Sequence, residues 1–160
     1  MRYLTLSELI YINGRLLNNA KIMSGKQKVR DIVLLEAAAV RPSASAFGED
    51  AYPTLADKAA ALFHSIVRNH PFTDGNKRTA TIAALLMFEV NGERAIWQPE
   101  DALATILSAA EGLRDVPHLA AWFSPVPTVS PTDPDAERDM QTIDRLISEN
   151  KWLLNELENR

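Results

Sequence analysis

Apolar residues recur every three or four positions in most segments of this chain, and residues that cap or break helices separate the segments. Near the start, Thr5-Leu6-Ser7-Glu8 has the form of a capping box, in which the threonine and glutamate side chains satisfy free backbone amides. Apolar stripes with this spacing need facing helices to bury them. With 160 residues, enough for a domain with a core, the chain is predicted to be an all-α bundle.

Caps and prolines bound the other helices that the spacing predicts. They are expected at about 29–40, from Thr54 through Ile66, after Gly75 to Val90, from Pro99 onward, and at about 118–123. The segment 41–53 lacks helical periodicity and contains small, turn-forming residues. A non-helical segment of this length is a candidate functional flap, and a plain connector is the alternative.

The chain is predicted to have three parts. Residues 1–123 form the compact domain, the four prolines of 124–134 indicate an extended linker, and 135–160 form a C-terminal amphipathic helix. The apolar face of that helix comprises Met140, Ile143, Ile147, Leu154 and Leu157. Such a face needs a partner surface. Its own domain, a second copy in a homo-oligomer, and a regulatory groove near the active site are the alternatives.

The charge is concentrated in the tail. Residues 133–160 hold eight acidic and four basic residues, which accounts for the whole net charge of −4, so the body is neutral. A neutral body with an acidic tail argues against direct binding of nucleic acid. The absence of cysteine excludes disulfides and thiolate metal sites, and no apolar run has the length expected of a membrane span. We therefore expect a cytoplasmic protein.

Residues 70–80 read HPFTDGNKRTA and join two predicted helices. His70 titrates near neutrality and can act as a general base. The free amides at the start of the helix after Gly75, near Asn76, form an anion site, to which Lys77 and Arg78 add positive charge. Asp74 provides hard oxygen ligands of the kind that Mg²⁺ accepts when a nucleotide provides the rest. Taken together, the residues indicate a nucleotide-dependent transferase, although each alone is more often structural; Phe72 is expected to be a buried anchor.

This motif closely resembles the signature loop of the Fic/Doc (Fido) family, in particular its death-on-curing branch. The resemblance extends over residues 1–123, through MRYLTLSELIYING and the run RPSASAFGEDAYPTLADKAAALFHSIVRNHPF. It implies a Fic/Doc-type helical bundle with a short flap, for which a β-hairpin is one form, and here an extra C-terminal helix.

The resemblance also implies roles for the matching residues. His70 would be the catalytic base, Asp74 would hold Mg²⁺ against ATP, and Gly75, Asn76, Lys77 and Arg78 would bind its phosphates. The flap would dock the target protein by strand addition and place its hydroxyl in line. That flap comprises Ser43, Ala44, Ser45, Ala46, Phe47, Gly48, Glu49 and Asp50.

The motif departs from that of the members that transfer AMP. Those members have glycine after the motif asparagine and a second arginine three residues beyond the first; here these positions hold Lys77 and Thr81. The lysine matches the death-on-curing pattern, which implies transfer of the γ-phosphate of ATP to a protein hydroxyl, with elongation factor Tu as the expected target. AMP transfer is the alternative enzyme. An inactive module that binds an antitoxin is the non-enzymatic alternative, against which the intact His70, Asp74 and Asn76 argue.

Overall fold

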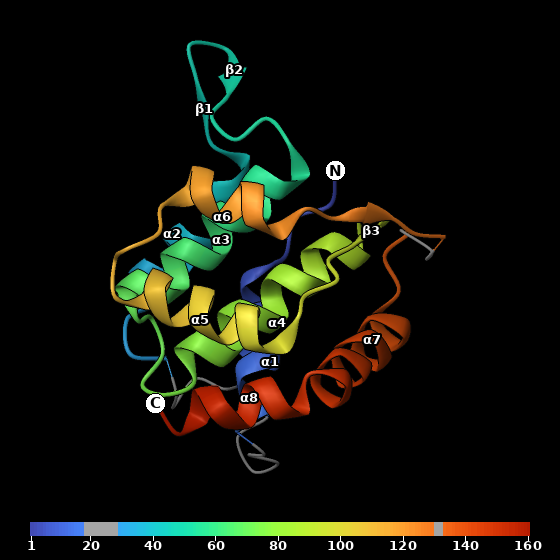
Figure 1. The fold of residues 1–160 in the computed structure, drawn as a ribbon. Coiled ribbons are helices and arrows are strands. Elements are labelled where there is room, and N and C mark those ends of the chain that lie inside the picture. The colour runs from blue at the N-terminus through green and yellow to red at the C-terminus, as the bar shows by residue number, and fades with distance from the viewer. Residues whose placement is uncertain (18–28, 130–132) are drawn as a thin grey trace.

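The computed structural model describes residues 1–17, 29–129 and 133–160, and these residues form the expected helical bundle (Figure 1). The helices of the compact part are α1 (Leu6–Leu16), α2 (Ile32–Val40), α3 (Leu55–Asn69), α4 (Asn76–Glu89), α5 (Pro99–Ala110) and α6 (Val116–Phe123). Two more helices follow, α7 (Ala136–Glu149) and α8 (Lys151–Glu158). The prediction of an all-α fold is confirmed.

Helix α4 lies at the centre of the bundle, and its residues are buried on all sides except at Lys77. It packs against α3, α1 and α7. The ring of Phe123 on α6 makes edge-to-face contacts with Phe63 on α3, at 6.0 Å, and Phe88 on α4, at 5.5 Å. This aromatic cluster joins three helices and fixes the α3–α4 pair.

Two helices, α1 and α3, begin at threonine residues that cap their first turns. Thr5 caps α1 and Thr54 caps α3, each in a reciprocal capping box with the residue three positions on, Glu8 and Asp57. The capping box predicted for α1 is therefore present. These caps determine where α3 begins, and its length then determines where the loop after it lies.

The flap segment forms a β-hairpin that projects from the body (Figure 1). Its strands are β1 (Ser45–Ala46) and β2 (Glu49–Asp50), which follow α2 through the 3-10 turn η2 (Arg41–Ser43). A second antiparallel pair joins β3 (Glu93–Arg94) to β4 (Val126–Pro127), so the first part of the linker is attached to the body.

The C-terminal segment folds as two helices, where the apolar spacing predicted one. The chain bends at Asn150, which lies between α7 and α8 and whose side chain donates to the carbonyl of Leu146. The buried apolar residues of the two helices are Ile143, Leu146, Leu153, Leu154 and Leu157. They pack on α4 and α5 of the same chain. The chain's own domain therefore covers this face, and the end of α8 lies beside Arg78 of the motif loop.

Ion pairs fasten α7 to the body at three places. Arg2 binds Asp139, Arg15 binds Asp144, and Arg145 binds the buried Glu89 on α4. Within the described ranges, no helix is long and apolar enough to cross a membrane.

Candidate active site

The motif loop lies between two residues with left-handed backbone conformation. His70 ends α3 with φ of 49°, and Gly75 begins α4 with φ of 75°. Few side chains adopt this conformation without strain, although histidine is among the better-tolerated residues. A Cβ atom on Gly75 would lie 3.3 Å from Asn13 Nδ2, a tight contact, so space as well as conformation favours glycine here.

The side chain of Asn76 holds the loop in shape. Its Oδ1 accepts a hydrogen bond from the amide of Phe72, and its Nδ2 donates to the carbonyl of Phe72, both at 3.0 Å. Phe72 is 1% exposed, as expected of an anchor. Asn76 Nδ2 also lies 3.5 Å from His70 Nδ1, at the outer limit of a hydrogen bond. Asn76 therefore defines the backbone of the loop and orients the histidine ring only weakly.

The imidazole of His70 is exposed, so a substrate can reach it. Partial desolvation of the ring lowers the pKa of His70 below its usual value of 6.5, and the positive charges of Lys77, Arg30 and Arg68 lower the pKa further. A histidine with a lowered pKa is neutral at pH 7 and has a lone pair with which to accept a proton.

Arg30 binds the backbone next to the histidine ring, and it was not identified from the sequence. Its side chain donates to the carbonyls of His70, at 2.6 Å, and Asn69, at 2.8 Å. The amides of Arg30 and Asp31 both donate to the carbonyl of Pro71, and Val29 pairs with Phe72 as an isolated β-bridge. The segment 29–31 thus forms one wall of the motif loop. No motif or periodicity indicates such a contact across forty residues.

Asn13 is a second residue that the sequence analysis missed. It is fully buried on α1, and its Nδ2 donates to the carbonyl of Asp74, at 2.9 Å, and to Thr79 Oγ1, at 3.1 Å. Among the described residues, its Oδ1 has no hydrogen-bond partner. A polar residue on the buried face of an amphipathic helix was the signal that could have identified it.

The N-terminus of α4 has the features of an anion site. Gly75, its N-cap, has no side chain that could bond the first amides. Arg78 is almost buried, and its guanidinium lies 3.7 Å from the carboxylate of Asp74. Lys77 is partly exposed beside it. The open amides, the helix dipole and two cations together favour a phosphate group.

Asp74 fits the role of a metal ligand that shares its ion with a nucleotide. Its side chain is 69% exposed, and its Oδ1 accepts from the amide of Gly75 at 2.7 Å. In the described part of the chain, no group of three or more His, Cys, Asp or Glu residues could hold a metal by itself. A single exposed carboxylate suits Mg²⁺, which usually binds one or two carboxylates along with waters and substrate phosphates.

Helix α8 borders this site. Glu158 Oε1 lies 3.8 Å from Arg78 Nη1, so the arginine faces a carboxylate on each side. A cavity of about 70 Å³ lies between the start of α4 and the end of α8, and a cleft of about 440 Å³ lies between α1, Asp74, Arg78 and the two C-terminal helices. Any anion that binds Arg78 competes with Glu158.

The structure does not bring the predicted flap next to His70. The hairpin precedes the N-terminus of α3, whereas His70 follows its C-terminus. The 15 residues of α3 span about 22 Å at the helical rise of about 1.5 Å per residue. Figure 1 shows the hairpin and the motif loop at opposite ends of α3. The predicted flap, Ser43–Asp50, and His70 therefore lie at opposite ends of the same rigid helix.

Thr81 is fully buried, and its hydroxyl donates to the carbonyl of Lys77 at 2.8 Å. This position therefore lies in the core and provides no group to a ligand. Elsewhere, His64 accepts from Arg41 at 3.1 Å, and His118 contacts Asp115, the N-cap of α6. Both histidines are parts of local hydrogen-bond networks.

The fold and site define a helical protein that presents an exposed histidine beside an open, positively charged helix N-terminus. A sequence model of the Fic/DOC family matches residues 3–88, more than half of the chain. A stretch of 68 residues is 57% identical to Toxin Doc of Mycolicibacterium smegmatis (strain ATCC 700084 / mc(2)155). The chain therefore belongs to the Fic/DOC family, and the similarity to Toxin Doc agrees with the predicted death-on-curing branch.

The matched stretch covers 42% of this chain and 52% of Toxin Doc. The chain thus spans about half the length of the relative that it matches. The family model ends at residue 88, so α5–α8 lie outside it.

Proposed function

We propose that this protein is a toxin-like protein kinase that transfers the γ-phosphate of ATP to a hydroxyl group of a protein. The observation that carries the proposal is the arrangement around one short loop. His70 ends α3 with its ring exposed, and the positive N-terminus of α4 follows six residues later with Lys77 and Arg78. Phosphoryl transfer requires mainly a base, positioned phosphates and positive charge, which this loop combines.

In the proposed reaction, the oxygen of the target hydroxyl attacks the γ-phosphorus and a new P–O bond forms. The bond between the γ-phosphorus and the oxygen that bridges to the β-phosphate breaks, and ADP leaves. His70 accepts the proton of the hydroxyl, and the lowered pKa of this histidine keeps the ring neutral before the reaction. The amides of α4 and Arg78 hold the phosphate oxygens.

Lys77 supports transfer of the γ-phosphate over transfer of AMP. Its side chain occupies space that glycine would leave open, and the buried Thr81 provides no second guanidinium. A nucleotide would therefore have to orient against a single arginine and a lysine. When bound, Mg²⁺ would neutralise phosphate charge, and Asp74 is the residue that would hold it.

The proposed partners follow from the family. The protein substrate would be a translation factor, with elongation factor Tu as the first candidate, and an antitoxin would neutralise the toxin. These events would take place in the cytoplasm. A homo-oligomer through α7 and α8 would require a surface other than their buried apolar face.

Labelling with two forms of ATP tests the proposal. The wild-type protein is incubated with elongation factor Tu and either γ-³²P-ATP or α-³²P-ATP. Label on the protein from the γ form alone is the expected result. Label from the α form would overturn the kinase in favour of AMP transfer, and no label from either form would favour a module that only binds its partner. His70→Asn is the control for contaminating kinases.

A further inference from the structure

Helix α2 has an unusual composition for a helix at the surface. Eight of its nine residues are apolar, and Glu36 is the only charged one. A helix that is apolar on every side is normally buried on every side. In α2, only Leu35 and Ala38 are buried, and they face the core.

The opposite face of α2 is open to solvent. Val33, Ala37 and Val40 follow one another at helical spacing on this face, and all three are exposed. Val33 is 69% exposed and Val40 is 63% exposed, and Ile32 beside them is 45% exposed. The result is an apolar strip along the full length of the helix, which we call the α2 strip (Ile32, Val33, Ala37 and Val40).

The α2 strip runs from the candidate active site to the hairpin. At one end, the backbone amide of the N-cap residue Asp31 donates a hydrogen bond to the carbonyl of Pro71, the residue after His70. At the other end, α2 continues through η2 into β1. Figure 1 shows α2 alongside α3, with the motif loop at one end and the hairpin at the other. The helix that carries the strip thus begins beside the loop at which the acceptor hydroxyl would bind.

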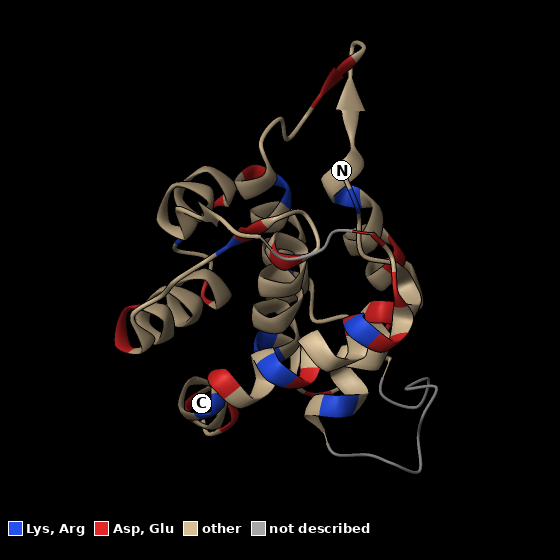
Figure 2. Ribbon diagram, turned by 90° about the vertical axis from the view of Figure 1, so that its right-hand side faces the viewer, with Lys and Arg blue, Asp and Glu red and all other residues tan. Residues whose placement is uncertain are grey.

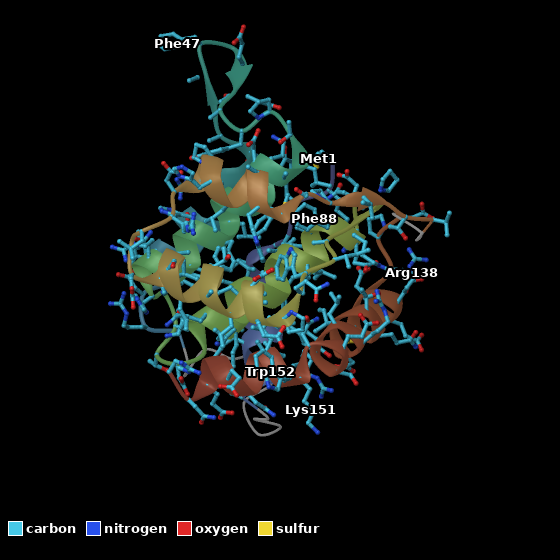
Figure 3. The ribbon with its side chains drawn as sticks, viewed as in Figure 1. Met1, Phe47, Phe88, Arg138, Lys151 and Trp152 are labelled. Carbon is cyan, nitrogen blue, oxygen red and sulfur yellow. The ribbon has the colours of Figure 1, made fainter. Side chains whose placement is uncertain are left out.

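The hairpin presents one more exposed apolar residue at its tip. Phe47 and Gly48 form a two-residue turn in which both φ angles are positive, at 54° and 79°. Such turns favour Asn-Gly, and a bulky residue in the first position is strained. Phe47 is nevertheless there, fully exposed, and its side chain points away from the body (Figure 3). An unfavourable residue without an internal contact suggests a function outside the folded chain.

We infer that the α2 strip and Phe47 form the docking surface for the protein substrate. The inference rests on the proposed function, because the start of α2 adjoins the loop that carries His70, where the hydroxyl of a protein substrate would bind. Acidic side chains accompany the apolar ones: Glu36 lies within the strip and Glu49 is exposed on β2, where Figure 2 shows the acidic residues of the hairpin. The surface therefore fits a partner with an apolar patch and basic residues around it.

The inference gives the hairpin a role that its distance from His70 permits. The hairpin would bind a part of the substrate far from its acceptor hydroxyl, and α2 would bind the part between the hairpin and the catalytic loop. Lys58, which is 2% exposed on α3, steadies the hairpin by donating to the carbonyl of Pro42 and to the carboxylate of Asp50. A fixed hairpin can contribute to binding with little ordering cost.

Three substitutions test the surface without disturbing the fold. Val33→Gln and Val40→Gln replace exposed side chains with a residue that favours helices. Phe47→Asn creates the turn sequence that this geometry favours, so it removes the aromatic ring while keeping or strengthening the hairpin. Leu113→Gln is the matched control, because Leu113 is 70% exposed and lies outside the surface.

The measurement is kcat/KM for phosphorylation of elongation factor Tu. If that protein is not labelled, the substrate is whichever protein in a bacterial extract accepts label from the wild type and not from His70→Asn. The triple variant is expected to lose about 30-fold in kcat/KM, mainly through KM, as expected when anchor residues are removed from an interface. ATP affinity, the unfolding midpoint and the mass in solution should stay at wild-type values.

The outcomes separate this inference from the proposed function. Equal kcat/KM in the triple variant and in Leu113→Gln overturns the docking surface and leaves the kinase intact. A change in solution mass in the triple variant also overturns it, because the face would then join two copies. If the wild type labels no protein, the proposed function fails, and this inference fails with it.

Discussion

The side chain of Asn76 bonds both backbone groups of Phe72, with its oxygen on the amide and its nitrogen on the carbonyl, each at 3.0 Å. This pair of bonds closes the motif loop across four residues, between His70 and the start of α4. The loop is thus held by a side chain whose two ends have opposite hydrogen-bonding character. An isosteric change that removes only the donor can test the arrangement.

Asn76→Asp should lower the free energy of unfolding by about 1–3 kcal/mol, the cost of placing an unsatisfied or repelled acceptor in a buried site. The new carboxylate would face the carbonyl of Phe72, and it would add negative charge at the proposed phosphate site. Denaturant unfolding checks the stability. The control is Asn159→Asp at an exposed position, which should change little. Unchanged stability in Asn76→Asp would contradict the assigned bonds.

His70→Asn should reduce transfer to the protein substrate by about 10²–10⁴-fold, the usual contribution of a general base. Asparagine is preferred to alanine here because it tolerates the left-handed conformation at φ of 49°. The unfolding midpoint and ATP affinity should stay near the wild-type values. Transfer at the wild-type rate would remove His70 from the mechanism.

The acidic limb of the pH profile of kcat/KM should lie below pH 6.5. Partial desolvation lowers the pKa of His70, as do Lys77, Arg30 and Arg68, so the ring stays neutral at a lower pH than free histidine. Lys77→Met should move the limb upward, because one of the three positive charges is removed. The same shift affects stability. The unfolded state binds the proton more tightly than the folded state, so protonation of His70 favours unfolding. Its contribution to the free energy of unfolding is therefore complete above pH 6.5 and is lost as the pH falls through the folded pKa. A limb above pH 6.5 in the wild type would refute this assignment.

Lys77→Gly should reduce transfer of the γ-phosphate, because the substitution removes a cation from the start of α4 and frees the space that its side chain occupies. Loss of γ transfer is the main expectation. A small amount of AMP transfer is the secondary expectation, because the buried Thr81 stands where AMP-transferring members have a second arginine. Parallel reactions with γ- and α-labelled ATP provide the measurement. Full γ transfer in the variant would show that Lys77 does not set the chemistry.

Glu158→Gln should increase ATP affinity by about two- to fivefold. Its carboxylate lies 3.8 Å from Arg78 and is 59% exposed, and pairs with this exposure are worth about 0.2–1 kcal/mol. Neutralising it frees the arginine for phosphate. Glu137→Gln is the matched control, since it removes the same charge from the exposed start of α7. Equal ATP affinity in the two variants would mean that Glu158 does not compete with the nucleotide.

Much of the site could be predicted because it is local in sequence. His70, Asp74 and Arg78 lie within nine residues, and the turn between two helices necessarily brings them together. The fold class was also predictable, since apolar spacing and capping boxes depend on neighbours three or four residues apart. The burial of Phe72 was also expected, because a large apolar side chain in a short loop between two packed helices favours the core.

Other features depend on contacts between distant segments. Arg30 reaches His70 across forty residues, Asn13 reaches Asp74 across sixty-one, and Glu158 reaches Arg78 from the far end of the chain. The length and direction of α3 separate the hairpin from His70, although both flank that helix in the sequence.

The sequence by itself therefore determined the helices, their caps and the chemistry of the motif loop, because short-range hydrogen bonds and apolar periodicity are local. Only the tertiary structure decided which surfaces surround that loop. It placed α8 against Arg78, bent the tail at Asn150 and left one face of α2 uncovered. Those outcomes depend on how whole helices pack, and packing is a sum of many weak contacts that no single stretch of sequence contains.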